Sequence, residues 1–328
     1  MASRIGSIRR LLDRVNVGMT AESLAVLLLK CLSIDPEVPC RFSGKRLTHR
    51  PYCSVFAVAV AVQGDLEERR VILKIYRDSQ SGLAEMLRRL KSELDSQEVC
   101  ITVPQLYATC ERDRVFLWEY ARGRTLLDEL LAARPVNLAV VRKAAKALAD
   151  LQRCPSVNSR PYTTADLVMS LNSWLSALPS EILPDGLCSE FHRRVASRLR
   201  NESLVLSNRC FIPGHLYLSE ERFSLIDWDQ HRLVPRAYDV GLFLSHLRRY
   251  ALEVPQRASD CDAYRRVFTD EASRRMQDLD QSTISLFEAA QLIRAARNCV
   301  QRNCGDFYRA RKLVHSALHS LYCTNGGD

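Results

Sequence analysis

One segment, residues 211–247, constrains the fold of this chain more than any other stretch. It contains a short apolar run, Phe223 to Ile226, that is largely strand-forming and leads directly into an Asp-Trp-Asp triplet at 227–229. A turn with Pro235 follows, and then an apolar run from Val240 to Leu247. We therefore expect a buried strand that passes through an acidic turn into a buried helix.

The two carboxylates of the triplet, Asp227 and Asp229, predict a cation site. A carboxylate at the end of a buried strand is costly unless it is paired or bound to a cation. Residues two apart on a strand share a face, so both side chains are expected to present oxygens together, as Mg²⁺ requires. Asp239 lies just before the apolar run, where it is expected to cap the helix or to tie down the neighbouring loop.

A second pattern predicts a hairpin near the N-terminal end. Residues 55–62 form a β-rich apolar run, a Gln-Gly-Asp turn follows at 63–65, and residues 70–76 form a second apolar run. Lys74 lies inside that second run. A buried lysine needs a partner, and the alternative is a lysine on the solvated face of an edge strand.

These segments resemble the aminoglycoside phosphotransferase and choline kinase-like family, above all in residues 225–229 and 237–241. The resemblance implies an α+β, protein kinase-like fold with two lobes, a small strand-rich N-lobe and a larger, mostly helical C-lobe. It also implies ATP and Mg²⁺ as cofactors. On this basis Asp227 binds the metal of the nucleotide, and Lys74 contacts the nucleotide phosphates.

The catalytic loop departs from the family pattern. The family places a His-Gly-Asp or His-Arg-Asp triplet upstream of the metal-binding Asp, and an Asn or Gln several residues later binds a second metal. The triplet that matches here is Pro213-Gly214-His215, which puts His215 at the position of the catalytic Asp. The Asn position falls near Glu220, which we assign to the metal together with Asp227 and Asp229.

Further nucleotide contacts follow from the resemblance. Glu85, on the helix expected after Lys74, is the candidate partner of that lysine. Its alternative is a solvated surface residue, because at 100° per residue it points almost opposite the leucine stripe of that helix. The strand at 115–120 resembles the hinge between the lobes, which makes Glu119 and Tyr120 candidate adenine contacts. Its alternative is a simple edge strand with a turn.

Strand patterns come first and helical patterns later in the 328 residues, which is typical of an α+β protein. We expect a helical extension at 1–40, an N-lobe with the nucleotide-binding sheet and hinge at 41–124, and a helical C-lobe that carries the catalytic loop at 125–328. No apolar run approaches the length of a membrane span.

The cysteine content indicates the cellular compartment, and the net charge indicates the kind of partner. Twelve cysteines without a Cys-x-x-Cys pair are interpreted as reduced thiols of a cytoplasmic protein. The net charge of +9 favours an anionic partner such as a nucleotide or an acidic protein. We do not expect specific nucleic-acid binding, because the basic residues lack the interleaved aromatics of a single-strand binder.

Three functions stay open on this evidence. The first is an ATP- and Mg²⁺-binding pseudokinase, or an impaired phosphotransferase, that acts as a binding or regulatory module. The second is an active ATP-dependent kinase of a small hydroxyl-bearing substrate. The third is a non-enzymatic interaction protein that binds a protein partner through its basic N-terminal surface. The fold alone does not choose among them.

Overall fold

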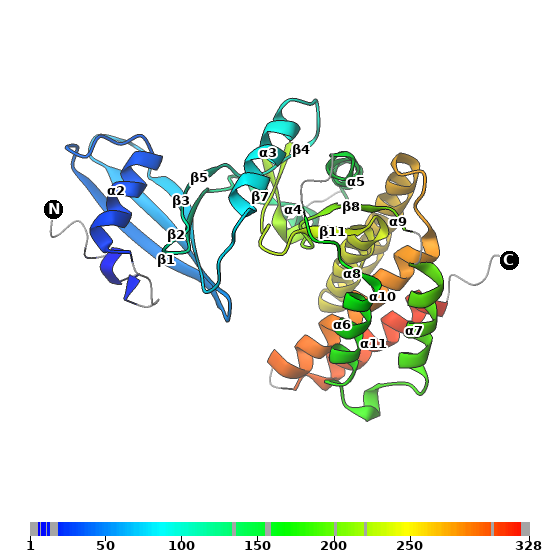
Figure 1. The fold of residues 1–328 in the computed structure, drawn as a ribbon. Coiled ribbons are helices and arrows are strands. Elements are labelled where there is room, and N and C mark those ends of the chain that lie inside the picture. Colours follow the sequence, from blue (N-terminus) through cyan, green and yellow to red (C-terminus); the bar gives the residue numbers. More distant parts are fainter. Residues whose placement is uncertain are drawn as a thin grey trace. The chain divides into compact units, whose positions relative to one another are not determined.

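The computed structural model describes residues 6, 8–10, 12–13, 19–132, 136–154, 159–199, 202–219, 222–302 and 305–322. It divides into two compact units (Figure 1): Met1–Glu93 with Val103–Arg122, and Leu94–Thr102 with Gly123–Asp328. Strands dominate the first unit and helices the second. The predicted α+β class is therefore confirmed.

The first unit is built on a five-stranded antiparallel sheet in the order β1-β2-β3-β6-β5. The strands are β1 Cys40–Arg50, β2 Cys53–Val62, β3 Arg69–Tyr76, β5 Leu106–Cys110 and β6 Val115–Glu119. The predicted hairpin corresponds to β2 and β3. Gly64 in its turn has φ +95°, a left-handed conformation that glycine adopts at no steric cost.

Helix α2 (Ala21–Cys31) covers one face of this sheet (Figure 1). Thr20 caps its N-terminus by accepting a hydrogen bond from the backbone N–H of Ser23 at 3.1 Å. Leu24 and Leu28 of the helix share a buried cluster with Phe56 of β2. Because these positions recur at helical spacing, one stripe of α2 closes the core of the first unit.

Two small sheets of the second unit anchor the connections at residues 208–215 and 226–231. One has the order β4-β10-β9-β7, and the other pairs β11 with β8. Their strands are β4 Ile101–Thr102, β7 Arg124–Thr125, β8 Leu204–Ser207, β9 Leu216–Ser219, β10 Arg222–Leu225 and β11 Arg232–Pro235. Residues 208–215 connect β8 to β9, and residues 226–231 connect β10 to β11. Paired strands therefore anchor both ends of each connection.

The other α-helices of the described chain are α3 Leu83–Asp95, α4 Leu126–Ala132, α5 Leu138–Arg153, α6 Thr164–Leu175, α7 Leu187–Arg198, α8 Ala237–Glu253, α9 Ala258–Arg275, α10 Gln281–Arg302 and α11 Phe307–Tyr322. The predicted apolar helix is α8, and both α9 and α10 pack against it. Phe243 of α8 stacks on Phe268 of α9, with ring centroids 3.9 Å apart. None of the helices in the described residues combines the length and the apolar character that a bilayer crossing needs.

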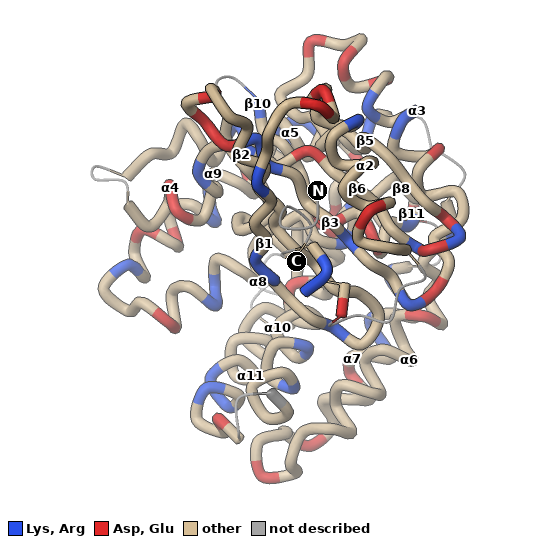
Figure 2. Tube along the Cα trace, turned by 90° about the vertical axis from the view of Figure 1, so that its left-hand side faces the viewer, with Lys and Arg blue, Asp and Glu red and all other residues tan. Residues whose placement is uncertain are grey.

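Charges of both signs are interspersed along the trace (Figure 2). On α7, for example, Glu190 pairs with both Arg193 and Arg194. The hydrogen bond from Arg193 is the largest cause that lowers the pKa of Glu190, to about 2. The positive charge of the two arginines is thus partly balanced by an acid on the same helix.

Gly241 lets α8 approach α10 closely. A Cβ at this position would lie 2.6 Å from the backbone nitrogen of Glu288 and 2.8 Å from the carbonyl oxygen of Ile284. We expect Gly241→Ala to reduce the free energy of unfolding by about 1–3 kcal/mol, because the two helix backbones must separate. Urea denaturation measures this loss. Gly214→Ala is the control, since its Cβ would meet only a Leu127 methyl group at 4.0 Å. Equal stability of the two variants would contradict the close approach.

Candidate functional site

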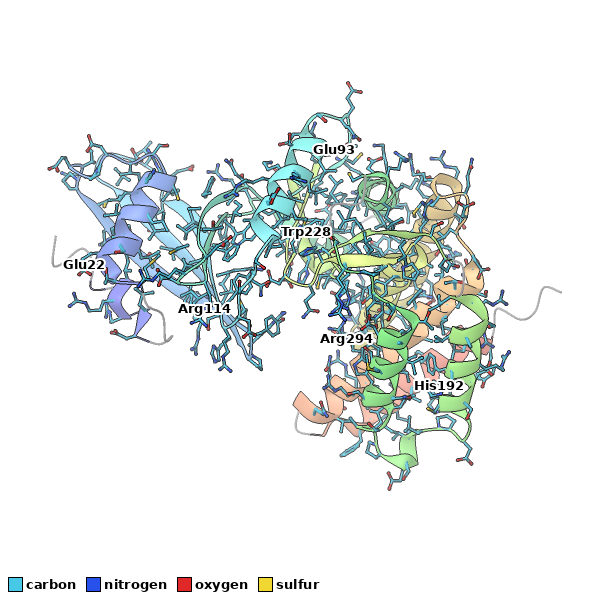
Figure 3. All side chains as sticks on the ribbon, in the orientation of Figure 1. Glu22, Glu93, Arg114, His192, Trp228 and Arg294 are labelled. Atoms are coloured by element: carbon cyan, nitrogen blue, oxygen red, sulfur yellow. The ribbon has the colours of Figure 1, made fainter. Side chains whose placement is uncertain are left out.

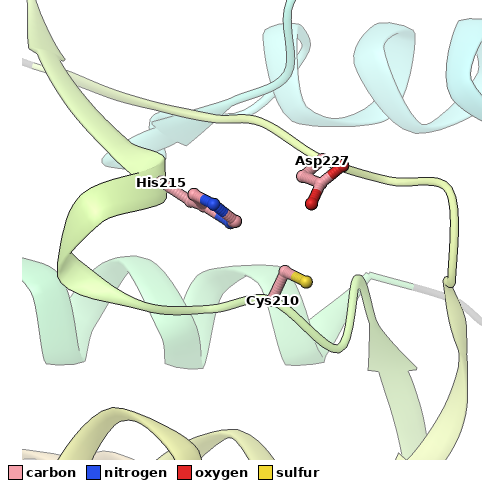
Figure 4. Close-up of side chains that lie close together, drawn as sticks. All are labelled: Cys210, His215 and Asp227. Atoms are coloured by element: carbon pink, nitrogen blue, oxygen red, sulfur yellow. The ribbon is translucent and has the colours of Figure 1, made fainter. Parts of the chain in front are cut away.

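Three side chains with different chemistry meet in the second unit (Figure 4). Cys210 and His215 come from the β8–β9 connection, and Asp227 comes from the β10–β11 connection. One ligand atom of each lies within 4.8 Å of the others. All three residues are half-buried. A thiol, an imidazole and a carboxylate thus converge on one small volume.

The backbone around Asp227 explains how its side chain reaches this volume. The Ile226 N–H donates to the carbonyl oxygen of His215 at 3.1 Å, which extends the β9–β10 pairing to the edge of the cluster. Asp227 has φ +66°, a conformation in which Asp and Asn are enriched among non-glycine residues. Since β10 ends at Leu225, the strand alternation expected to place Asp227 and Asp229 on one face does not apply. The shared role of the two carboxylates therefore stays a prediction, and the cluster found among the described residues contains Asp227 without Asp229.

Asn208 is a positioning residue that the sequence did not reveal. Its side chain is fully buried. Its amide nitrogen donates to the carbonyl oxygen of Ile226 at 2.9 Å, and its amide oxygen accepts from the Cys210 N–H at 3.0 Å. One side chain therefore joins the backbone next to Asp227 to the backbone of Cys210. The only signal in the sequence was an Asn directly after a strand, where turns begin.

Asp239 ties the start of the same loop to α8. It is fully buried and accepts a hydrogen bond from the Ser207 hydroxyl at 2.7 Å. The Ser207 oxygen in turn accepts from the backbone N–H of Arg209 at 2.7 Å. Of the two roles expected for Asp239, the structure shows the loop contact. Burial raises the pKa of Asp239 to about 7, although the Ser207 hydrogen bond and the charge of Arg209 act in the opposite direction.

Trp228, labelled in Figure 3, is the buried residue of this turn. Its ring is 2% exposed, and its Nε1–H donates to the carbonyl oxygen of Leu225 at 2.8 Å. This bond spans the residues on either side of Asp227. Packing and hydrogen bonding therefore fix the turn that presents the carboxylate.

Two other predicted site residues lie on the first unit. Lys74 is 9% exposed in β3, opposite Val55 of β2 and Phe116 of β6. Glu85 is exposed on α3, and its carboxylate pairs with Arg89 one turn along the same helix. This pairing is the surface arrangement named as the alternative for Glu85.

Two more of the predicted site residues, Glu119 and Tyr120, lie at the end of β6. A carboxylate oxygen of Glu119 accepts from the Gln105 N–H at 2.9 Å. The Arg70 guanidinium lies 5.9 Å from the ring centroid of Tyr120. Glu220, predicted as a metal ligand, lies outside the described residues.

A cavity of about 320 Å³ opens in the second unit beside Arg209, the residue before Cys210 in the sequence. Its lining includes Tyr162, Asp166, Trp174, Arg209 and Arg232. The Arg209 guanidinium lies 4.5 Å from the ring centroid of Tyr162, which is within cation–π range. Two guanidinium groups and one carboxylate give this lining a positive balance, with aromatic faces beside it.

Comparison with known proteins places these features in a family. A model described as the phosphotransferase enzyme family matches residues 59–279. This range contains β3, the three-residue cluster and Asp239. No curated protein matches the chain.

Solved structures show the same fold at low sequence identity. Amicoumacin kinase hAmiN, in complex with AMP-PNP, Ca²⁺ and Ami, is 14% identical with a TM-score of 0.57, over 93% of this chain and 97% of that one. Choline kinase from Cryptosporidium parvum Iowa II is 12% identical with a TM-score of 0.56, over 91% and 95%. A streptomycin–ATP–APH(2″)-IIa ternary complex is 12% identical with a TM-score of 0.53, over 93% and 96%. The kinase-like fold predicted from the sequence is therefore confirmed.

Proposed function

The chain belongs to the phosphotransferase enzyme family, and from this we propose that it binds ATP with a divalent cation while its altered catalytic loop transfers phosphoryl groups poorly or not at all. It would then act as a pseudokinase, a binding or regulatory module built on a transferase fold. The observation that carries this proposal is the thiol of Cys210 beside Asp227.

The spacing of the loop supports this assignment. In protein kinases the catalytic Asp precedes the metal-binding Asn by five residues, in the pattern H-R-D-x-x-x-x-N. Cys210 precedes His215 by five residues, and His215 is followed at once by the hairpin that leads to Asp227. We therefore place Cys210 at the Asp position and His215 at the Asn position. This register differs from the one read from Pro213-Gly214-His215, which put His215 at the Asp position.

The exchange of side chains weakens catalysis more than binding. A thiol accepts a hydrogen bond only weakly, so Cys210 orients an acceptor hydroxyl less firmly than a carboxylate does. His215 offers nitrogen where Mg²⁺ prefers oxygen. Asp227 keeps a hard oxygen donor, so of the three residues it is the one that would hold Mg²⁺. Mg²⁺, when bound, would neutralise charge on the nucleotide phosphates.

The remaining assignments follow the family resemblance. Lys74 would contact the nucleotide phosphates, and Asp229 would add an oxygen to the metal. Glu119 and Tyr120 would lie at the adenine, with their backbone groups as the contacts. Glu85 would be the partner of Lys74 once it leaves Arg89.

The cavity beside Arg209 favours a second candidate, an active kinase of a small hydroxyl-bearing molecule. Arg209, which lines the cavity, directly precedes Cys210 in the sequence. A bound acceptor would therefore lie beside the catalytic loop. The excess of guanidinium groups over carboxylates in its lining disfavours a polycationic acceptor, because like charges repel at close range.

Nucleotide binding is tested by thermal unfolding with ATP and Mg²⁺, compared with ATP and a chelator. Ligand at 100 times its Kd should stabilise the protein by about 2.7 kcal/mol, a shift of several degrees for a chain of this size. We expect Asp227→Asn to lose the part of this thermal shift that depends on Mg²⁺. Asn tolerates the left-handed backbone, so the variant removes charge without new strain. Asp185→Asn, on an exposed loop, should behave as the wild type. No shift at millimolar nucleotide would refute nucleotide binding.

Impaired transfer is tested with the same protein. Cys210→Asp should raise Mg²⁺-dependent ATP hydrolysis about 10-fold or more, because a positioned base contributes about 10²–10⁴-fold. Cys210→Ser is the matched control and should not raise it. A wild type that already turns over at about 10 s⁻¹, a typical enzyme rate, and loses activity in Cys210→Asp would favour the active kinase.

A further inference from the structure

The donor atoms of the three-residue cluster suit a different cation from Mg²⁺. They are one sulfur, one imidazole nitrogen and one carboxylate oxygen. Thiolate and imidazole select Zn²⁺ and related transition metals, whereas Mg²⁺ prefers oxygen ligands. Three protein ligands and one open position are also the usual arrangement of a zinc site that keeps a water.

The distances are close to those of an occupied site. Zinc bonds of about 2.0–2.3 Å in a tetrahedron put ligand atoms about 3.5 Å apart. The atoms of Cys210, His215 and Asp227 lie within 4.8 Å of one another. Closing the remaining gap takes about 1 Å, which side-chain rotation about χ1 and χ2 supplies. All three residues are half-buried, so each remains partly accessible to solvent.

The surrounding backbone is arranged before any ion arrives. Asn208 joins the Cys210 N–H to the carbonyl oxygen of Ile226, and His215 is paired to Ile226. A metal site gains affinity when partners outside the ligand set fix the ligands in place. Across the described ranges, no second group of three His, Cys, Asp or Glu side chains converges in this way.

We propose that Cys210, His215 and Asp227 form a binding site for Zn²⁺ or a chemically similar divalent transition metal. On binding, the Sγ–H bond of Cys210 breaks, its proton passes to solvent, and an Sγ–metal bond forms, so affinity rises with pH. The site needs no nucleotide. If the chain also binds Mg²⁺-ATP as proposed above, the two cations compete for Asp227, and zinc becomes an inhibitor of nucleotide binding.

The test uses Co²⁺ alone, added to the full chain without nucleotide. The wild type should bind one equivalent and show a thiolate-to-cobalt charge-transfer band that Zn²⁺ abolishes. Cys210→Ser should remove the band, and His215→Gln should weaken Co²⁺ binding at least about 100-fold, because losing only an outer partner of a ligand costs about 10–100-fold. Cys188→Ser is the matched control. That thiol is exposed and its Sγ lies 3.9 Å from Nε2 of His192, a residue of α7 that Figure 3 labels. It is a rival Cys–His pair, and its loss should leave the band unchanged.

A second measurement avoids any variant that fails to fold. In the wild type, Zn²⁺ should slow alkylation of Cys210 by iodoacetamide and leave the rate at Cys188 unaltered, as read by peptide mass. No band at millimolar Co²⁺, a band that survives Cys210→Ser, or equal protection of both thiols would overturn the proposal. Because these assays contain no nucleotide, their outcome is separate from that of the ATP experiment.

Discussion

Replacing Arg265 with Leu should lower the free energy of unfolding by about 3–5 kcal/mol, because it leaves a buried carboxylate without its partner. Arg265 on α9 donates to one oxygen of Glu288 at 2.5 Å and to the other at 3.1 Å. It also donates to the carbonyl oxygen of Leu244 at 2.7 Å. The side chains of Arg265 and Glu288 are only 15% and 5% exposed. Urea denaturation at neutral pH measures the loss.

Two further variants separate the buried charge from lost packing. The double variant Arg265→Leu/Glu288→Leu should recover most of the stability, since replacing a whole buried ion pair by apolar groups is often neutral. Arg274→Leu removes an ion pair on the same helix whose arginine side chain is 64% exposed, and should cost at most about 1 kcal/mol. If Arg265→Leu lowered the free energy of unfolding no more than Arg274→Leu does, the buried pair would not stabilise the protein more than an exposed one.

Asp239 should make stability fall as pH rises. Its pKa in the folded state is raised to about 7, first of all by burial, whereas an unfolded Asp titrates near 3.9. Between these values the folded state binds more protons than the unfolded state. The free energy of unfolding therefore drops by up to about 1.4 kcal/mol per pH unit, and levels off above pH 7. Relative to Asp239→Asn, which does not titrate, the wild type should lose about 2–3 kcal/mol between pH 5 and pH 8.

The comparison with Asp239→Asn isolates this effect from other groups. Burial lowers the pKa of His246 on the same helix well below its usual value, so His246 makes the fold less stable in acid and opposes the trend of Asp239. Both proteins carry His246, and its contribution cancels in their difference. A difference that stays constant from pH 5 to pH 8 would show that Asp239 is ionised throughout.

The sequence predicted the elements whose patterns are local. The β2–β3 hairpin follows from two apolar runs around a Gly-Asp turn, and α8 follows from the apolar run after Asp239. A buried Lys74 also stands out within its strand. Each of these signals comes from one continuous stretch of about twenty residues or fewer, where periodicity reports directly on burial.

The cluster itself could not be predicted in the same way. The loop that carries Cys210 has no periodic pattern, and its shape depends on Asn208, which bonds backbone atoms 18 residues away in sequence. The left-handed φ of Asp227 ended the strand one residue earlier than its apolar run suggested. Of the register proposed above, the sequence itself offers one signal, the spacing of five residues from Cys210 to His215.

The bonding of Asn208 has a consequence for how chemistry can change in this fold. The Asn208 side chain bonds to main-chain atoms of Ile226, Asp227 and Cys210, so these hydrogen bonds do not involve the side chains of Cys210 and Asp227. Reactive groups can therefore be exchanged by point mutation without rebuilding the loop. The same protein becomes a practical scaffold: Cys210→Asp with His215→Asn would install oxygen donors, and reversing them would restore the sulfur and nitrogen pair.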